Sequence, residues 1–339
     1  MSAGAPAPGS SPRVVRLGDR DVVFPSADLG QIEDSSALLS AGDGGASLRA
    51  ALARDGFVYL RGVLGAAAVL AAREVVLAHL RAQGGVLEAR GDGSVLLPAC
   101  GLGCLPNMEG VNSVTHAPAV LAVLEGAPLR RAVAAALGAA DAAGALATFD
   151  YKWLRAVGRR TFTGVHADSV YMSRGSPQLL TAWVPLEPAA TLELGALALC
   201  RGSHAAAGLA RVRATYGAFD TEAEPGFEGS GWLTCDPADV ARRDAGVRWV
   251  AGDYAAGDVI LFGMHTLHMS TANLTDRVRL SADVRWQPAA HAIDDRYVGT
   301  AAEMAEKAAA RKKGGAYARD DGAGGAAVTM DDLRARWGL

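Results

Sequence analysis

The hydrophobic pattern over residues 46–83 predicts a helix, a strand and a second helix. Apolar residues recur at helical spacing in "ASLRAALARD", and this helix is expected to end near Asp55-Gly56. The run "FVYLRGV" that follows has the composition of a strand. An alanine- and leucine-rich helix then extends to about residue 83, and further helices are expected around residues 116–139.

From about residue 144 the pattern changes to short apolar runs separated by turn residues. Strands of this length and spacing predict an antiparallel sandwich or barrel. The runs are "ALATFDYKWLRAV", "TGVHADSVYM", "LLTAWVPLE", "GALALCRGSH", "RWVAGDYAAGDVILFGMHTLHMS" and "RVRLSADVRWQP".

Three segments differ from this strand-rich core, which we place at about residues 144–290 within a single domain of residues 46–300. Residues 1–45 begin rich in Ala, Pro, Ser and Gly, and are predicted to be a disordered or irregular leader. Residues 205–246 form a polar insertion between strands and are predicted to be a lid. Residues 301–339 are predicted to be a tail that is helical and then glycine-rich.

Composition and charge exclude several classes of partner. The formal net charge of the 339 residues is −3 and no basic run is long enough to follow a phosphate backbone, so nucleic acid is not expected. No apolar stretch reaches the ~18 residues of a membrane-spanning helix, and the N-terminus lacks the apolar core of a secretory signal. We expect a cytoplasmic protein without a membrane partner; organellar targeting by the leader is the alternative. The four cysteines are interpreted as free thiols.

The stretch "TGVHADSVYM" carries the first candidate for chemistry. Side chains alternate along a strand, so His166 and Asp168 are expected to share one face. Two exposed polar residues on the wet face of a strand would look the same. A later apolar strand is followed by His265 and His268, and its spacing favours His268, with Ser270 on the same face. Two imidazoles and one carboxylate are typical of a non-haem Fe(II) site, whereas a structural zinc site uses four protein ligands.

The order of several motifs resembles the phytanoyl-CoA dioxygenase family of Fe(II)- and 2-oxoglutarate-dependent oxygenases. "LRAALARDGFVYLRGVL" is similar to the opening helix and strand of that family, and "HAD" stands at its H-x-D position. "AWVPLE", "GALALCRGSH" and "HMSTANLTDRVRLS" follow in the family's order, the last with an arginine eleven residues after its histidine. The resemblance covers about residues 46–290. It implies a mainly β, cupin-like jelly roll, the double-stranded β-helix, with N-terminal helices flanking it.

By position, this resemblance implies that His166, Asp168 and His268 bind the iron. In halogenating relatives a small residue replaces the carboxylate, so Asp168 favours hydroxylation, desaturation or a related oxidation. Ala167 stands where relatives often carry glutamine, a difference that we expect to change contacts with the substrate.

The resemblance also implies a site for 2-oxoglutarate. Arg279 would pair with the distal carboxylate, for which a planar and permanently charged guanidinium is suited. Ser270 would add a hydrogen bond, and Trp183 stands at the position that packs against the co-substrate. Lys152 or Tyr151, on the preceding strand, would also reach it.

Other residues are candidates for contact with the substrate. Tyr151, Ala167, Tyr171 and Arg174 are expected to line its binding site, although Tyr171 and Arg174 would equally well finish the strand. The segments at 84–112 and 205–246 are expected to control selectivity. The substrate itself and the oligomeric state are not determined by the sequence.

The resemblance thus implies a dioxygenase that uses Fe(II), 2-oxoglutarate and O2. It would hydroxylate a small molecule at an unactivated C–H bond and release succinate and CO2. Two other classes are weighed against it: a non-catalytic, cupin-like protein that binds metal or a small molecule, and a zinc-dependent hydrolase. The intact triad together with Arg279 argues against the first, and no glutamate next to the ligands offers the general base of the second.

Overall fold

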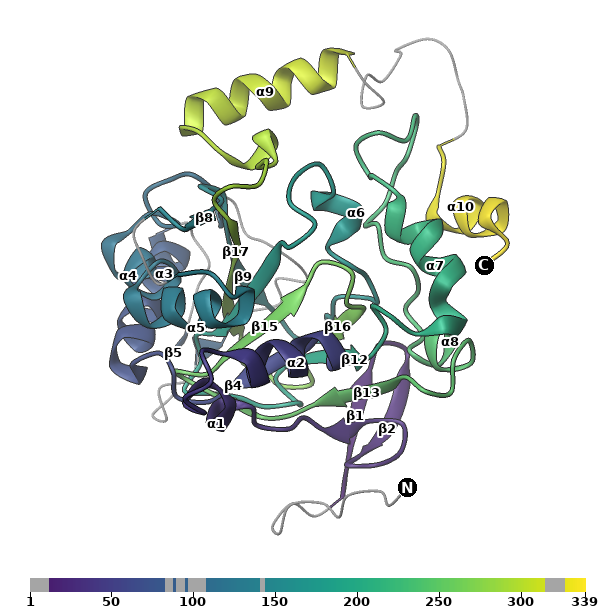
Figure 1. The fold of residues 1–339 in the computed structure, drawn as a ribbon, viewed down its shortest axis with the longest axis horizontal. Helices are drawn as coiled ribbons and strands as arrows, with labels where there is room; N and C mark the ends of the chain where they lie inside the picture. Colours follow the sequence, from purple (N-terminus) through teal and green to yellow (C-terminus); the bar gives the residue numbers. More distant parts are fainter. Residues whose placement is uncertain (1–11, 83–87, 90–94, 97–107, 141–143, 315–326) are drawn as a thin grey trace.

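Two β-sheets face each other at the centre of the protein and helices cover the outside (Figure 1). The computed structural model describes residues 12–82, 88–89, 95–96, 108–140, 144–314 and 327–339. Neighbouring strands are antiparallel except for one short parallel pair in the smaller sheet. The jelly-roll fold that the sequence predicts is therefore confirmed.

The larger sheet has seven strands, in the order β4-β15-β10-β17-β9-β7, with β8 also paired to β17. β17 lies at its centre and is long enough to pair with β10, β9 and β8. The bounds are β4 Phe57–Leu60, β7 Glu109–Gly110, β8 Leu146–Thr148, β9 Lys152–Val157, β10 Leu180–Pro185, β15 Val259–Gly263 and β17 Arg279–Pro288.

The smaller sheet has four strands, in the order β16-β12-β13-β3. Its strands are β3 Gly30–Gln31, β12 Leu197–Arg201, β13 Arg248–Ala251 and β16 His268–Ser270. Three two-stranded pieces complete the strands: β1 Arg13–Leu17 with β2 Arg20–Phe24, β5 Glu88–Ala89 with β6 Val95–Leu96, and β11 Ala189–Ala190 with β14 Tyr254–Ala255.

Side-chain alternation divides the residues of the larger sheet between two hydrophobic cores. Trp183 and Phe262 point inward and join one core with residues of the smaller sheet. Leu154, Leu261 and Leu280 point outward and join a second core beneath the helices. β10 and β15 lie between other strands of this sheet and are buried on both faces, which is why "TAWVP" and "VILF" read as continuous apolar runs.

Four helices cover the outer face of the larger sheet. α2 ends at Gly56, whose positive φ of 87° is the left-handed conformation that glycine adopts readily at a helix C-terminus. The covering helices are α2 Ala46–Asp55, α3 Ala66–Ala82, α4 Pro118–Leu124 and α5 Ala127–Leu137, and a short α1, Ser36–Leu39, precedes them.

The insertion at 205–246 consists of short helical turns beside the smaller sheet. The C-terminal helix α10 (Met330–Trp337) lies next to α7 of the insertion in Figure 1, and the indole of Trp337 is 5.4 Å from the ring of Phe219. The remaining helices are η1 Ala207–Leu209, α7 Ala210–Ala214, η2 Tyr216–Ala218, α8 Ala238–Ala241, α6 Ser169–Met172, η3 Asp295–Tyr297 and α9 Ala301–Gly314.

The prediction of a disordered or irregular leader over residues 1–45 is wrong from residue 13 onward. Residues 13–24 form the hairpin β1-β2, and the side chains of Val15, Leu17 and Phe24 enter the core between the sheets. The main chain of Arg16 accepts a hydrogen bond from Ala272 N–H at 2.8 Å. The hairpin is ordered because these partners lie about 250 residues away, where no local pattern reveals them.

Several predictions lie outside the described residues. These are the first part of the leader, most of the segment at 84–112 with Cys100 and Cys104, and the glycine-rich stretch at 315–326. Within the described residues, Cys200 and Cys235 are free thiols. None of the helices in the described ranges is long and apolar enough to cross a membrane.

Candidate metal centre

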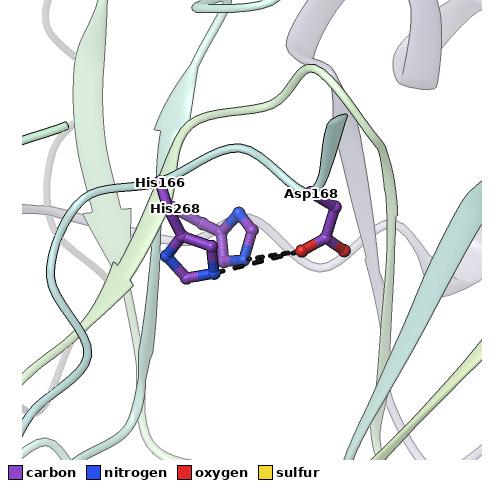
Figure 2. Close-up of side chains that lie close together, drawn as sticks. All are labelled: His166, Asp168 and His268. Carbon is purple, nitrogen blue, oxygen red and sulfur yellow. Dashed lines mark ion pairs between the residues drawn. The ribbon is translucent and has the colours of Figure 1, made fainter. Parts of the chain in front are cut away.

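His166, Asp168 and His268 meet between the two sheets (Figure 2). One ligand atom from each lies within 4.8 Å of the other two. Oδ1 of Asp168 is 3.9 Å from Nε2 of His166 and 3.7 Å from Nε2 of His268. Because they converge at this distance, the three side chains form a set that a single metal ion can bridge.

Main-chain pairing brings the two histidines together. His166 and His268 form an antiparallel bridge in which the N–H of each donates to the carbonyl of the other at 2.9 Å. The segment before His166 is also paired to the insertion, because Leu233 N–H donates to Val165 O at 2.7 Å. The position of His166 is thus fixed from both sides.

The prediction that "TGVHADSVYM" is one strand is wrong at Asp168. The chain leaves the extended conformation there, and α6 begins at Ser169. The carbonyl of Asp168 accepts from Tyr171 N–H and Met172 N–H, both at 3.0 Å. The carboxylate reaches the histidines because the chain turns at this residue, and not through strand alternation.

Hydrogen bonds set the orientation of both imidazoles. Nδ1 of His166 lies 2.9 Å from Gly164 O, and Nδ1 of His268 lies 3.0 Å from Thr266 O. A carbonyl only accepts, so each Nδ1 carries the proton and each Nε2 presents a lone pair toward Asp168. Burial and then the neighbouring His268 lower the pKa of His166 to about 3, and burial also lowers the pKa of His268. Both rings are neutral near pH 7, as metal ligands must be.

The two oxygens of Asp168 have different surroundings. Oδ1 faces the histidines, whereas Oδ2 accepts from the hydroxyl of Thr181 and from Nη2 of Arg285, at 3.1 Å. Burial alone would raise the pKa of this carboxyl, but Arg285 and the two histidines outweigh that effect and lower it. Asp168 is therefore ionised, with one oxygen engaged by the protein and one directed at the metal position.

These residues fit non-haem iron. The donor set of two neutral imidazoles and one carboxylate is the facial triad of Fe(II) oxygenases, which leaves open coordination positions. Among the described residues no cysteine or further carboxylate joins the group, so the four-ligand pattern of structural zinc is not met.

A cavity of about 610 Å³ opens from the triad, a volume typical of small-molecule sites. Arg279, Ser270 and Trp183 all line it, as expected for residues that contact a co-substrate. Nη1 of Arg279 donates to Ser281 Oγ, while Ser270 Oγ accepts from Thr163 N–H at 2.9 Å. The structure thus gathers the three metal-ligand candidates and three of the 2-oxoglutarate candidates, Arg279, Ser270 and Trp183, around one space.

A model of the phytanoyl-CoA dioxygenase family matches residues 52–281. That range holds the triad, Arg279 and the strands that carry them. The chain belongs to the phytanoyl-CoA dioxygenase family. It is accordingly an oxidoreductase of the non-haem iron class, with Fe(II) and 2-oxoglutarate as its cofactors, and the resemblance drawn from the motifs is confirmed.

Solved structures show the same fold. The carbocyclase SnoK of nogalamycin biosynthesis, described as non-haem and α-ketoglutarate-dependent, is 19% identical, with 78% of this chain and 90% of that chain covered and a TM-score of 0.53. EctD from S. alaskensis, solved with 2-oxoglutarate and 5-hydroxyectoine, is 18% identical, with 87% and 90% covered and a TM-score of 0.50. A search of curated proteins found no match.

Some candidates lie in the cavity and others do not. Tyr151 and Tyr171 line it. Lys152 does not: it points to the helical side of β9, where its ammonium lies 2.6 Å from Glu125 and donates to Phe149 O. Alternation along β9 explains this, because the neighbours of Lys152 and not Lys152 itself face the cavity.

Two further candidates for substrate contact, Ala167 and Arg174, do not line the main cavity. Ala167 is buried beside Tyr216, on the side away from the main cavity. Arg174 is exposed and its Nε lies 2.6 Å from Asp220. Its position beyond α6 turns it toward the insertion, which the prediction of a straight strand did not include.

The other histidines have separate surroundings. His265 lies near a small void with Arg213 and Tyr216 and is not part of the triad. Nε2 of His204 is 2.9 Å from Ala53 O, in keeping with the structural role that the sequence suggested. The structure brings His268 and not His265 into the group, but strand alternation is not the reason, because the chain turns at residues 264–265 and does not continue as one strand.

Sequence reasoning missed Arg285, Thr181, Trp153 and Trp232. Arg285 could have been found, because it alternates with Arg279 along β17 and shares its face. Thr181 offered no such indication, since a threonine on a buried strand is common. Trp232 lies in the insertion, whose path the sequence does not determine.

Proposed function

We propose that the protein hydroxylates a small-molecule substrate at an unactivated C–H bond, with 2-oxoglutarate as co-substrate and succinate and CO2 as co-products. The observation that carries this proposal is the convergence of His166, Asp168 and His268 at one end of a cavity that Arg279 also lines. A buried guanidinium that lines the same cavity is suited to a dicarboxylate co-substrate.

In this proposal His166, Asp168 and His268 hold the iron. Three protein ligands leave positions for the co-substrate and for O2. When bound, iron and 2-oxoglutarate supply the oxidising chemistry, as cofactors do in general, and the protein contributes orientation and electrostatics. The retained carboxylate at residue 168 supports oxygenation over halogenation.

Arg279 is the residue that we assign to the distal carboxylate of 2-oxoglutarate. It is 4% exposed, and a buried guanidinium is well matched to a dicarboxylate by charge and by its planar donors. Ser270 lies on the strand of His268 and offers a hydroxyl, while Trp183 offers an apolar wall. Together they would orient the co-substrate toward the triad.

Thr181 and Arg285 would position the carboxylate ligand. By engaging Oδ2 of Asp168 they leave only Oδ1 for the metal, which keeps the carboxylate from taking a second coordination position. Partners of this kind commonly tune metal affinity.

The test is an anaerobic titration of the metal-free protein with Fe(II) and 2-oxoglutarate, followed by visible absorbance. A weak charge-transfer band that requires both additions is the expected result. A folded, metal-binding protein without this band would point to the cupin-like binding protein. Hydrolysis that is supported by Zn²⁺ and indifferent to 2-oxoglutarate would point to the hydrolase.

A further inference from the structure

Aromatic side chains form much of the cavity wall beyond the triad and Arg279. They come from separate parts of the chain: the strand β9, the segment before His166, α6, the insertion and η3. These residues are Tyr151, Trp153, Phe162, Tyr171, Trp232 and Tyr297. The chain has 20 aromatic residues in all, 6 Trp, 7 Tyr and 7 Phe, so nearly a third of them line this part of one cavity.

The tyrosine hydroxyls in this wall already have protein acceptors. Tyr151 donates to Glu109 at 3.0 Å, Tyr297 donates to Tyr171 O at 3.0 Å, and Tyr171 donates to Ser230 O. A hydroxyl that is engaged in this way has less to offer a ligand. What these residues present to the cavity is ring surface.

The charged side chains of the cavity wall form ion pairs with one another. Nη1 of Arg155 lies 3.4 Å from Glu109, and Nη1 of Arg285 lies 2.8 Å from Asp283. Nη1 of Arg296 lies 3.4 Å from Glu222. These three pairs contain all the Asp, Glu and Arg residues among the described lining residues other than Asp168 and Arg279. A charged ligand would compete with these existing partners, most unfavourably at Arg285 and Asp283, whose pair is buried.

Binding of a cationic ligand is disfavoured for a second reason. Rings of Trp and Tyr attract cations, so a cluster of them can bind quaternary ammonium groups. Here the guanidinium of Arg285 already lies 4.2 Å from the ring centre of Trp153, and that of Arg296 lies 5.3 Å from Tyr297. The protein supplies its own cations to this cluster.

Trp232 is held in place by the segment that carries His166. A Cβ atom on Gly164 would come within 2.6 Å of its indole, which shows how closely the ring packs on the main chain there. The ring of Phe162 stacks beside it, with centres 6.2 Å apart and planes at 27°. Half-buried and lining the cavity, the two rings form a rigid apolar surface next to the metal centre.

From these observations we infer that the substrate is an electrically neutral molecule with an aromatic or fused-ring system, and that this ring stacks on Trp232 and Phe162. The inference rests on the proposed function, because it concerns the substrate of the same site. Trp232 then determines substrate specificity. The cavity selects molecules that are uncharged and contain a flat ring.

The experiment uses the full chain loaded anaerobically with Fe(II) and 2-oxoglutarate, so that binding is measured without turnover. Three probes share one ring and differ in charge: 1-naphthol, 1-naphthoate and trimethyl(1-naphthylmethyl)ammonium. 1-Octanol serves as the neutral probe without a ring. Equilibrium dialysis gives their dissociation constants, and the charge-transfer band is recorded in the same samples.

We expect 1-naphthol to bind at least ~10-fold more tightly than the other three probes. Trp232→Ala should weaken 1-naphthol about tenfold, as expected for the loss of one stacked ring, and Trp232→Phe should retain most of the affinity. Leu274→Ala, which removes an exposed side chain outside the cavity lining, is the matched control.

Equal or tighter binding of a charged naphthalene or of octanol would overturn the inference, as would unchanged 1-naphthol binding in Trp232→Ala. The band separates the two proposals. If the band forms and the preference for 1-naphthol is absent, the inference alone fails. If the preference is present and no band forms, the proposed function fails.

Discussion

Each metal-ligand candidate in this site is oriented by hydrogen bonds with neighbouring residues. Asp168 is the clearest example, because Thr181 and Arg285 engage one oxygen and leave the other for the metal. His166 and His268 follow the same rule through the main-chain carbonyls at their Nδ1 atoms. Each ligand candidate therefore depends on a neighbour that does not itself touch the metal position.

The two histidines near the end of β15 provide a direct test of the triad. In His268→Ala the Fe(II) and 2-oxoglutarate band should disappear, because one of three ligands is lost. In His265→Ala the band should persist, since this residue lies outside the triad. Anaerobic absorbance titration measures both. Loss of the band in His265→Ala alone would show that the third ligand has been assigned to the wrong residue.

Thr181→Val keeps the shape of the side chain and removes the hydroxyl that donates to Asp168. We expect Fe(II) affinity to fall by about tenfold, the usual scale for loss of a partner that orients a ligand. Thr215→Val is the control, since the Thr215 hydroxyl is exposed and donates to the main chain of the insertion. Equal Fe(II) affinity in wild type and Thr181→Val would argue against this positioning role.

Arg279 and Lys152 were both candidates for contact with 2-oxoglutarate, and the structure separates them. Arg279→Met should weaken 2-oxoglutarate binding about 100-fold, because a buried charged hydrogen bond is lost. Lys152→Met should leave it within about twofold of wild type, since its ammonium faces Glu125. Titration of 2-oxoglutarate against the Fe(II)-loaded protein gives both values. A large effect of Lys152→Met would restore the prediction made from the sequence.

At the scale of elements, the C-terminal helix holds the insertion in place. Leu333 of α10 is fully buried in one hydrophobic cluster with residues of the insertion, and Trp337 packs on Phe219. Val328 N–H donates to Gly226 O at 2.8 Å, and Nη1 of Arg334 lies 3.3 Å from Leu233 O, next to Trp232. The segment predicted to be a tail thus determines where one wall of the cavity lies.

Leu333→Ala should loosen the insertion, because a large-to-small change in a buried position costs about 2–5 kcal/mol. We expect limited proteolysis within residues 205–246 to speed up at least ~10-fold. Arg336→Ala is the matched control, since its ion pair with Glu224 is half exposed and contributes little. If both variants were cleaved at the wild-type rate, α10 would not be what secures the insertion.

At the scale of the whole molecule, buried ionisable groups link stability to pH. Burial raises the pKa of the Cys200 thiol to about 12 in the folded protein, from 9.0 for an ordinary cysteine. Above pH 9 the unfolded chain ionises at this position while the folded chain does not. The contribution of the Cys200 thiol to the free energy of unfolding is therefore complete below pH 9. Above pH 9 it falls by about 1.4 kcal/mol per pH unit.

Cys200→Ala should lack this dependence. The difference in unfolding free energy between wild type and Cys200→Ala should change by about 2 kcal/mol between pH 8.5 and 10.5, in the direction that disfavours the wild type. Urea titration at each pH measures it. Cys235→Ala, at a half-buried thiol, should show a smaller change. A constant difference for Cys200→Ala would mean that the thiol ionises equally in both states.

The sequence by itself predicted the strand-rich core, the helices that precede it and the three residues that the structure brings together as a candidate metal site. It could do so because alternation and helical spacing are local, and because the order of the motifs matches the family. Arg279, Ser270 and Trp183 were also identified in this way, and all three line the cavity. Arg285 lies on the same face of β17 as Arg279, so the same reasoning could have identified it.

Only the tertiary structure determined which distant residues each side chain contacts. Arg285 and Asp168 are 117 positions apart, and no pattern predicts their contact. Lys152 faces the helices because of the register of β9 in the sheet, and the hairpin β1-β2 is ordered by partners near Thr271. Local patterns specify which residues share a face. The free energy of long-range packing determines what that face meets, and here it also determines which side chains line the cavity.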